Sequence, residues 1–172
     1  MSNLRLINET TVTSGVSTVS ATDVFSADYD IYKITLEGFY ASTIDYFYLR
    51  LINSSGSVIA TTYDCAALEF PPMYERKGTN FTGLFPSTNY LPNSEAESYN
   101  AVLYLFNPAS SSNYSFMLGQ SSEVEYTAGY FNKYIGVLKQ TISIAGFQLS
   151  VGTLGGTLSG GKIRTYGLRV DS

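Results

Sequence analysis

Paired carboxylates are the residues in this sequence whose type and spacing could do chemistry. On a β-strand, positions i and i+2 share a face and lie about 6.5–7 Å apart, within the roughly 5–9.5 Å that glycoside hydrolysis requires of two carboxyl groups. Each pair adjoins a predicted turn, where acidic residues also serve solubility, and the chain has no Trp to form a sugar platform. We therefore expect no catalytic residues and no enzymatic activity. The pairs are Asp28 with Asp30, Glu95 with Glu97, and Glu123 with Glu125.

Other catalytic and metal chemistries are limited by what the sequence lacks. It contains no His and one Cys, Cys65. Without His there is no Ser-His-Asp or Cys-His arrangement and no His-ligated metal, and one Cys forms neither an internal disulfide nor a zinc ribbon. The neighbouring charge of Asp64 disfavours a thiolate, so we expect Cys65 to be a small buried apolar residue.

One further segment and one group of aspartates could in principle hold a ligand. Gly152–Gly161 is rich in glycine but matches neither phosphate-binding fingerprint, and no helix follows it, so we expect tight turns around Thr157-Leu158. Four aspartates could supply oxygen ligands to Ca²⁺, although their spacing lacks the pattern of a dedicated loop. We expect no cofactor and no metal, and a structural calcium ion stays an open alternative. The aspartates are Asp23, Asp28, Asp30 and Asp45.

Net charge and composition limit the classes of partner that this protein can bind. Ten Lys and Arg against fourteen Asp and Glu give a net charge of −4, which disfavours a protein that grips phosphate backbones. The residues after Met1 do not form a signal peptide, and no stretch approaches the ~20 apolar residues that cross a bilayer. We expect neither a nucleic-acid nor a membrane partner. Charged residues are 14% of the chain and Tyr occurs 15 times, which is typical of a surface covered by other subunits, or simply of strong β propensity.

The elements that must position these residues are strands. Polar and apolar residues alternate through Tyr32–Glu37, a further strand is expected at Tyr99–Phe106 ending at Asn107-Pro108, and Phe47–Ile52 followed by the turn Asn53–Gly56 predicts a hairpin. Further strands are expected at 113–118 ending at Gly119, 123–131, 134–140, 141–144, 147–151 with a bulge at Ala145-Gly146, and 162–170, with others before residue 25. This is an all-β pattern of roughly 8–10 strands, an antiparallel β-sandwich. The last strand can pair with an early one only if the chain crosses between sheets, which favours a jelly roll.

One long segment lacks the regular spacing of strands and turns seen in the rest of the sequence. Residues 64–98 hold four of the five prolines together with many aromatic and apolar residues, so we expect a long ordered loop on a single domain, 15–172, preceded by a flexible N-terminal arm, 1–14. We expect this loop and the arm to contact other proteins. The predicted interface residues are Phe70, Pro71, Pro72, Met73, Tyr74, Phe81, Leu84, Phe85, Tyr90 and Leu91, with Leu4 and Leu6 from the arm.

The tyrosines on predicted strands are further candidates for an interface. Some of them must face outward, where a tyrosine can stack on carbohydrate or anchor a protein contact, although packing in the core is the default for any one of them. They are Tyr40, Tyr46, Tyr48, Tyr104, Tyr126, Tyr130 and Tyr134.

The order of several short motifs resembles a known group of proteins. They are Val24–Ile34, Tyr48–Gly56, Leu105–Pro108, Ile142–Phe147 and Thr157–Leu168. Together they resemble small jelly-roll virion proteins of tailed bacteriophages, especially marine phages, which occur as capsid decoration or cement proteins and as modules of tail appendages. The resemblance spans about residues 18–170 and includes no catalytic residue.

This resemblance implies a non-enzymatic virion protein made in the host cytoplasm. We expect it to bind major capsid protein or other virion proteins at the outer surface of the capsid, with several of its own copies associating in the assembled particle. The alternative is a tail fibre, baseplate or other appendage module that recognises host glycans. A hydrolase is the third interpretation, and it requires two carboxyl groups that face each other in a pocket.

Overall fold

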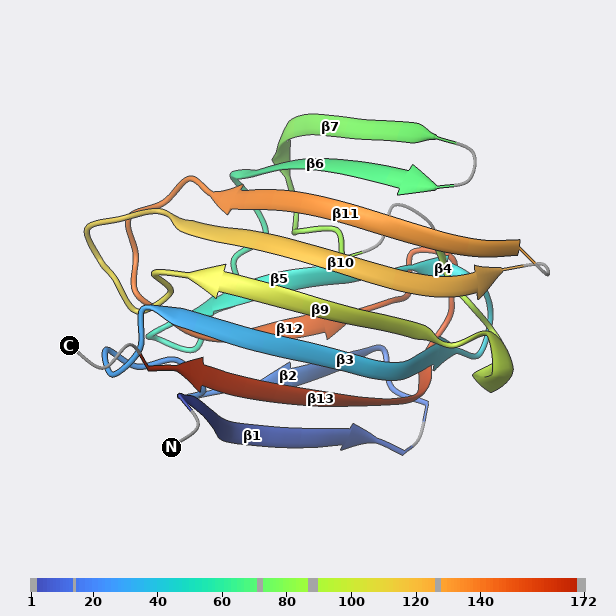
Figure 1. Ribbon diagram of the computed structural model, residues 1–172, viewed down its shortest axis with the longest axis horizontal. Coiled ribbons are helices and arrows are strands. Elements are labelled where there is room, and N and C mark those ends of the chain that lie inside the picture. Colours follow the sequence, from blue (N-terminus) through green and yellow to red (C-terminus); the bar gives the residue numbers. More distant parts are fainter. Residues whose placement is uncertain (1–2, 14, 71–72, 87–89, 126–127, 170–172) are drawn as a thin grey trace.

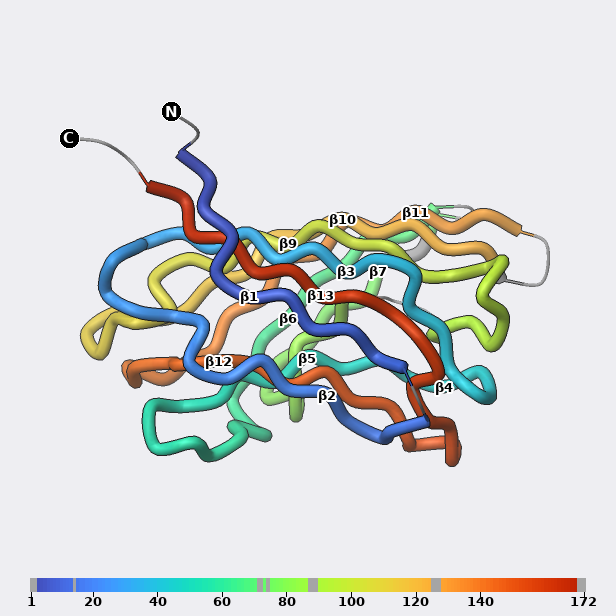
Figure 2. The backbone as a smooth tube through the Cα atoms, turned by 90° about the horizontal axis from the view of Figure 1, so that it is seen from below, coloured from blue at the N-terminus to red at the C-terminus, as the bar shows by residue number. Residues whose placement is uncertain are grey.

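The computed structural model of the chain is a two-layered β-sandwich (Figures 1 and 2). It describes residues 3–13, 15–70, 73–86, 90–125 and 128–169. The larger layer is an antiparallel sheet of eight strands. In spatial order they are β1 (Leu4–Val12), β13 (Leu158–Leu168), β3 (Ile31–Ala41), β9 (Tyr99–Phe106), β10 (Ser115–Glu125), β11 (Ala128–Leu138), β6 (Tyr63–Phe70) and β7 (Tyr74–Phe81).

The second layer is smaller. It consists of β2 (Thr18–Ala21), β12 (Ile144–Ser150) and β5 (Tyr48–Asn53), in that spatial order. Two strands of two residues each, β4 (Asp45–Tyr46) and β8 (Tyr90–Leu91), pair with each other. A 3₁₀ helix at Glu95–Glu97 completes the described elements. No helix among the described residues is long and apolar enough to cross a bilayer.

The core lies between the two layers because each strand turns alternate side chains inward. In β3, Tyr32, Ile34 and Leu36 are buried and face residues of the smaller sheet such as Leu49 and Phe147, which are also in the core. A buried tyrosine illustrates how polar groups are accommodated there. The Tyr63 hydroxyl donates to the Ile59 carbonyl at 3.0 Å and accepts the Leu51 N–H at 2.9 Å, so its burial leaves no polar atom unsatisfied.

The all-β sandwich is confirmed, and the final strand does pair with early ones. β13 lies between β1 and β3, and the chain crosses between the layers because β2 and β12 belong to the smaller sheet. The layers are nevertheless unequal, eight strands against three, and the described residues form thirteen strands in place of the expected 8–10. The predicted bulge at Ala145-Gly146 is also confirmed, since the β12–β5 register shifts between Ile144 and Gly146.

The predicted loop 64–98 is wrong over most of its length. Residues 64–70 belong to β6 and 74–81 to β7, an antiparallel pair that extends the large sheet beyond β11. The proline pair 71–72 falls between these two strands in the sequence and lies outside the described residues. Proline and aromatic content alone does not distinguish a pair of strands from a long loop, which is why the prediction failed.

The predicted flexible arm 1–14 is wrong as well. Residues 4–12 form β1, an edge strand whose partners run from Leu4↔Leu168 to Val12↔Gly161. Pairing with the last strand of the chain places Asn3 beside Arg169, and the Arg169 N–H donates to the Asn3 carbonyl at 2.8 Å. Both ends of the described chain thus lie at one end of the sandwich (Figure 2).

The predicted break at Gly119 is also wrong, because this glycine lies inside β10. A Cβ built at Gly119 would lie 2.0 Å from a ring atom of Tyr134 on the neighbouring strand. The glycine therefore provides room for a buried ring and does not end the strand, a role that glycine takes where a neighbour approaches closely.

Candidate functional site

The outer face of the eight-stranded sheet carries several exposed apolar side chains. We define the outer face as the side of that sheet turned away from the core. In β9 the inward residues Ala101, Leu103 and Leu105 are buried, and the intervening Val102 and Tyr104 point outward with exposed fractions of 36% and 39%. An antiparallel sheet with one solvated face normally carries polar residues there, so these apolar residues call for an explanation.

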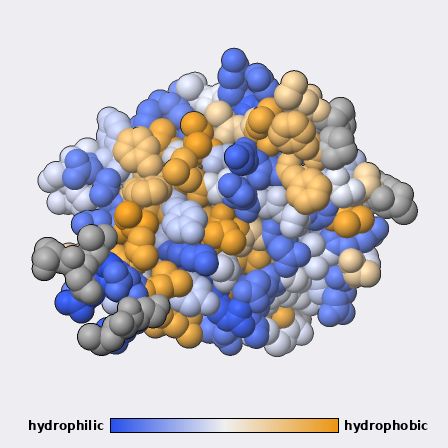
Figure 3. Space-filling model, viewed as in Figure 1, coloured by the Kyte–Doolittle hydropathy of each residue, from blue (hydrophilic) through white to orange (hydrophobic). Residues whose placement is uncertain are grey.

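Cross-strand register gathers the exposed apolar side chains. Leu118 is paired with Tyr104 on one side and with Ile135 on the other, and the two aliphatic side chains are 46% and 55% exposed. Phe131 is paired with Phe70, and these rings are 59% and 46% exposed. Figure 3 shows apolar residues in patches over the middle of this face, with hydrophilic side chains between them.

The face is hollowed into an open trough of about 1290 Å³. Its lining residues come from six adjacent strands, β3, β9, β10, β11, β6 and β7. Contiguous exposed apolar surface that is rimmed by polar groups marks interaction sites in soluble proteins. The arrangement can bind a partner that has apolar groups to bury.

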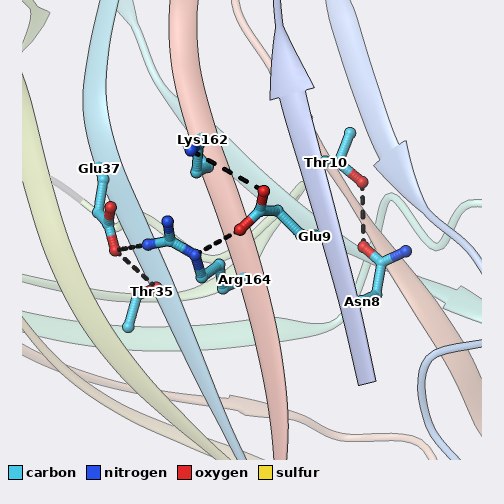
Figure 4. Close-up of polar contacts among 7 residues, drawn as sticks. All are labelled: Asn8, Glu9, Thr10, Thr35, Glu37, Lys162 and Arg164. Atoms are coloured by element: carbon cyan, nitrogen blue, oxygen red, sulfur yellow. Dashed lines mark hydrogen bonds and ion pairs between the residues drawn. The ribbon is translucent and has the colours of Figure 1, made fainter. Parts of the chain in front are cut away.

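One edge of the face is held together by an ionic network (Figure 4). The Arg164 guanidinium on β13 contacts Glu9 on β1 at 2.6 Å and Glu37 on β3 at 2.5 Å, and Lys162 lies 3.8 Å from Glu9. The hydrogen bond from Arg164 lowers the pKa of Glu9, and the two carboxylates raise the pKa of Arg164. These charges link three strands and neutralise one another, because two cations meet two anions.

The twelve predicted interface residues do not form one surface. Phe70, Met73 and Leu6 are exposed, at 46%, 73% and 50%, and Leu4 is partly exposed. Phe70 and Leu6 belong to strands of the large sheet. Pro71 and Pro72 lie outside the described residues, as does the side chain of Tyr74.

The remaining five predicted residues are wholly or partly buried, so they do not present the contact surface expected of the long ordered loop. Leu84, Phe85 and Leu91 are 1%, 8% and 0% exposed, and Phe81 packs against the core. The cause is backbone pairing: Leu84 exchanges two hydrogen bonds with Leu49 at the edge of β5, so its side chain enters the sandwich. Tyr90 is half-buried, with its ring 4.7 Å from that of Tyr46.

Sequence reasoning missed most of the outer face. Of the strand tyrosines, Tyr104 does face outward and Tyr134 faces inward at 4% exposure, whereas Tyr126 lies outside the described residues. A usable signal was that Tyr99–Phe106 and Ser115–Leu118 carry apolar residues at both alternating sets of positions, so that one apolar set had to face away from the core.

The carboxylate pairs lie in three unrelated places. Asp28 and Asp30 are exposed, and the Asp28 carboxylate accepts the Ser26 hydroxyl at 3.0 Å. Glu95 and Glu97 belong to the 3₁₀ helix, where the strand spacing does not apply. The carboxylate of Glu123 is buried on the inner face and accepts the Asn132 side-chain amide at 3.1 Å, and the side chain of Glu125 lies outside the described residues.

Asp45, one of the calcium candidates, is engaged by the glycine-rich connection between β12 and β13. Its Oδ2 accepts the N–H groups of Gly152 at 2.9 Å and Gly156 at 2.8 Å, and its Oδ1 accepts the Tyr46 N–H at 2.7 Å. The Thr153 hydroxyl and the Leu154 N–H donate to the same carboxylate at 2.8 and 3.1 Å. Burial by itself would raise the pKa of Asp45, but these hydrogen bonds outweigh burial and hold the pKa below its ordinary value.

This connection is the segment predicted to form turns around Thr157-Leu158. The turns in fact precede Thr157, with Gly152 and Gly155 at φ of 120° and 91°, and Leu158 already begins β13. The predicted second turn is an irregularity within the strand, where the β13–β3 register shifts between Gly160 and Lys162. Among the described residues, no group of three or more Cys, Asp or Glu is placed to hold a metal ion.

Cys65 is half-buried on the inner side of β6, where it packs against the core. Its thiol lies 3.8 Å from the Gly83 carbonyl. Burial raises the pKa of the Cys65 thiol to about 11, and the nearby charge of Asp64 adds to that effect. The thiol is therefore protonated and unreactive at neutral pH.

Comparisons with known proteins add little to this description. No protein-family model and no curated protein matches the chain. Among solved structures, 98% of the chain aligns with a chain described as the infectious bursal disease virus Gx strain, at 13% identity and a TM-score of 0.13. A second alignment covers 96% of the chain, with the infectious bursal disease virus VP2 subviral particle, at 10% identity and a TM-score of 0.18. This chain spans about two fifths of the length of those viral chains, and similarity at this level supports no inference.

Proposed function

We propose that this protein is a non-enzymatic structural component of a bacteriophage particle that attaches to the outer surface of the capsid. The observation that carries the proposal is the apolar outer face of the large sheet, with Leu118, Ile135 and Phe131 exposed at 46–59%. Leaving such side chains in water costs free energy, at about 25 cal/mol for each Å² of apolar surface. Burying the face against another protein of the particle recovers that free energy.

The contact proposed here differs from the one expected at first. The sequence assigns the contact to the loop 64–98 and the arm 1–14, but 74–81 and 4–12 are strands of the large sheet itself. Of the exposed residues among them, Phe70 on β6 and Leu6 on β1 belong to that sheet and extend the outer face, whereas Met73 lies between β6 and β7. The virion assignment is supported by the sequence motifs, and the mode of attachment by the apolar face.

The proposal is tested on purified particles of the phage that carries this sequence. Quantitative mass spectrometry should find the protein in hundreds of copies per particle, whereas a handful of copies would indicate a tail component. In a second step, the variants Ile135→Asp and Leu154→Asp are added to particles that lack the protein. Ile135→Asp should lose binding. Leu154, 58% exposed in the glycine-rich connection between β12 and β13, provides the matched control, and its variant should bind normally.

A second candidate, recognition of host glycans by a tail appendage, is favoured by the polar residues in the trough. Asn100 and Gln120 line it together with the exposed ring of Tyr104, and such groups bind sugars by hydrogen bonding and stacking. Binding on a glycan array, combined with no binding to capsids, would replace the first proposal with this one.

A further inference from the structure

The charges in the trough define the chemistry of its partner more narrowly. Three lysine side chains and two carboxylates line its outer-face rows, in a protein whose net charge is −4. One of the two carboxylates, Glu37, is already engaged by Arg164. The trough is therefore locally cationic. The cationic residues are Lys33, Lys77 and Lys133, and the second carboxylate is Glu75; Arg76 on β7 turns inward, where its guanidinium lies over the Phe85 ring.

The register of the sheet places two of these lysines in one row. Lys33 on β3 pairs with Tyr104, which pairs with Leu118, and Leu118 pairs with Ile135. The row continues from Ile135 to Ala66 and ends at Lys77 on β7. An apolar stretch of this row, from Tyr104 to Ala66, is thus flanked by a lysine on each side, and beyond Lys33 the row continues to Tyr166 and Leu6. Five strand spacings of about 4.8 Å separate the lysines by about 24 Å.

A third lysine lies in the next row. Lys133 pairs with Gln120 on one side and with Leu68 on the other. Neither Lys133 nor the two bracketing lysines takes part in any of the ion pairs found within the described part of the chain. The networks that neutralise Arg164 and Lys139 leave these three ammonium groups available to a ligand.

From this arrangement we propose that the trough binds an acidic, amphipathic segment of a partner protein, whose apolar residues cover the row from Tyr104 to Ala66 and whose carboxylates meet Lys33 and Lys77. This inference rests on the proposed function, because it specifies the partner of the same face. Two identical faces would bring lysines against lysines, so the charges oppose a second copy of this chain packed face to face.

The size and lining of the trough favour a protein segment over other polyanions. A length of about 24 Å matches roughly seven residues of extended chain or sixteen of helix. The aliphatic side chains of Leu118 and Ile135 offer no hydrogen bonds to a sugar. Three lysines are also few for a nucleic acid that carries a charge every ~1.7 Å of duplex.

The probe is a displayed library of random 16-residue peptides, selected on the full chain. Enriched peptides should carry acidic residues on both sides of an apolar stretch, and their binding should weaken when NaCl is raised from about 50 to 500 mM, because salt screens exposed charges. Binding should fall at least tenfold for the double variant Lys33→Glu/Lys77→Glu. The control Arg5→Glu reverses an exposed cation outside the trough and should bind as the unchanged protein does.

A second variant separates the apolar contribution. Ile135→Thr keeps a β-branched residue on a central strand, and it should weaken the selected peptides without changing the circular dichroism spectrum. The proposal is overturned if the enriched peptides are neutral or basic, or if acidic peptides bind the double variant unchanged. Selective binding of uronic-acid or sulfated polysaccharides without any peptide enrichment overturns it too, and so does self-association that Ile135→Asp abolishes.

Failure of this inference and failure of the proposed function give different results. Selection of acidic peptides together with absence of the protein from particles would leave the inference intact and refute the function. Conversely, particle binding that is lost in Ile135→Asp but unaffected by Lys33→Glu/Lys77→Glu would support the function and refute the acidic partner.

Discussion

Replacing Asp45 by Asn tests whether one carboxylate organises the connection between the two layers. The substitution preserves shape, but an amide has one acceptor oxygen where the carboxylate has two. With the amide nitrogen at the Oδ1 position, the Thr153 hydroxyl can rotate to accept, while the Tyr46 N–H, which donates to Oδ1 at 2.7 Å, loses its acceptor. Gly152 and Gly156 still donate to Oδ2, now to a neutral group.

The expected cost follows from those contacts. A buried backbone N–H without a partner costs about 1–3 kcal/mol. Hydrogen bonds to a charged acceptor are worth about 1.5–3 kcal/mol against about 0.5–1.5 for neutral ones, so the bonds that remain also weaken. We expect Asp45→Asn to lower the free energy of unfolding by about 3–5 kcal/mol, a large part of the roughly 5–15 kcal/mol of a typical domain.

Urea denaturation followed by circular dichroism measures this difference. The matched control is Asp30→Asn at an exposed carboxylate, which should change the free energy of unfolding by no more than about 0.5 kcal/mol. If Asp45→Asn costs less than about 1 kcal/mol, the carboxylate does not organise the connection and the reasoning is wrong.

The pH dependence provides a second check with a definite sign. The folded-state pKa of Asp45 lies below its unfolded value, so ionisation of Asp45 stabilises the protein fully above the unfolded pKa of about 3.9. That stabilisation is lost as pH falls through the folded pKa. The difference between the unchanged protein and Asp45→Asn should therefore be constant from pH 5 to 8 and shrink below pH 4. An equal difference at pH 3 and pH 7 would contradict this account.

Three further outcomes follow from the packing. Gly119→Ala should destabilise the protein by about 1–3 kcal/mol, because the added Cβ would lie 2.0 Å from the ring of Tyr134, whereas Gly129→Ala, with no atom within 4 Å of its Cβ, should be neutral in the same urea titration. Tyr63→Phe should cost about 1–3 kcal/mol by differential scanning calorimetry, because a buried backbone N–H loses the hydroxyl that accepts it; no change in stability would show that water replaces the hydroxyl. The Cys65 thiol, whose pKa is about 11, should react slowly with iodoacetamide at pH 8 and quickly after unfolding, and rapid labelling of the folded protein would disprove its protection.

The sequence alone determined the fold class and much of the strand pattern. Alternation through Tyr32–Glu37 falls within β3, because a strand with one buried face needs apolar residues at every second position. The bulge at Ala145-Gly146 was visible as a one-residue slip in that alternation. The absence of His from the sequence excluded whole classes of catalytic site, since chemistry depends on residue type before it depends on geometry.

The tertiary structure alone decided which side chains meet. Asp45 and Gly156 are more than one hundred positions apart, and no local pattern connects a carboxylate to N–H groups that distant. The same holds for the row from Lys33 to Lys77, which exists only because six strands from separate parts of the chain adopt one register. Alternation specifies that a residue faces one side of its strand, but the position of the second layer determines which side is the core, and so leaves Leu118 and Ile135 facing outward.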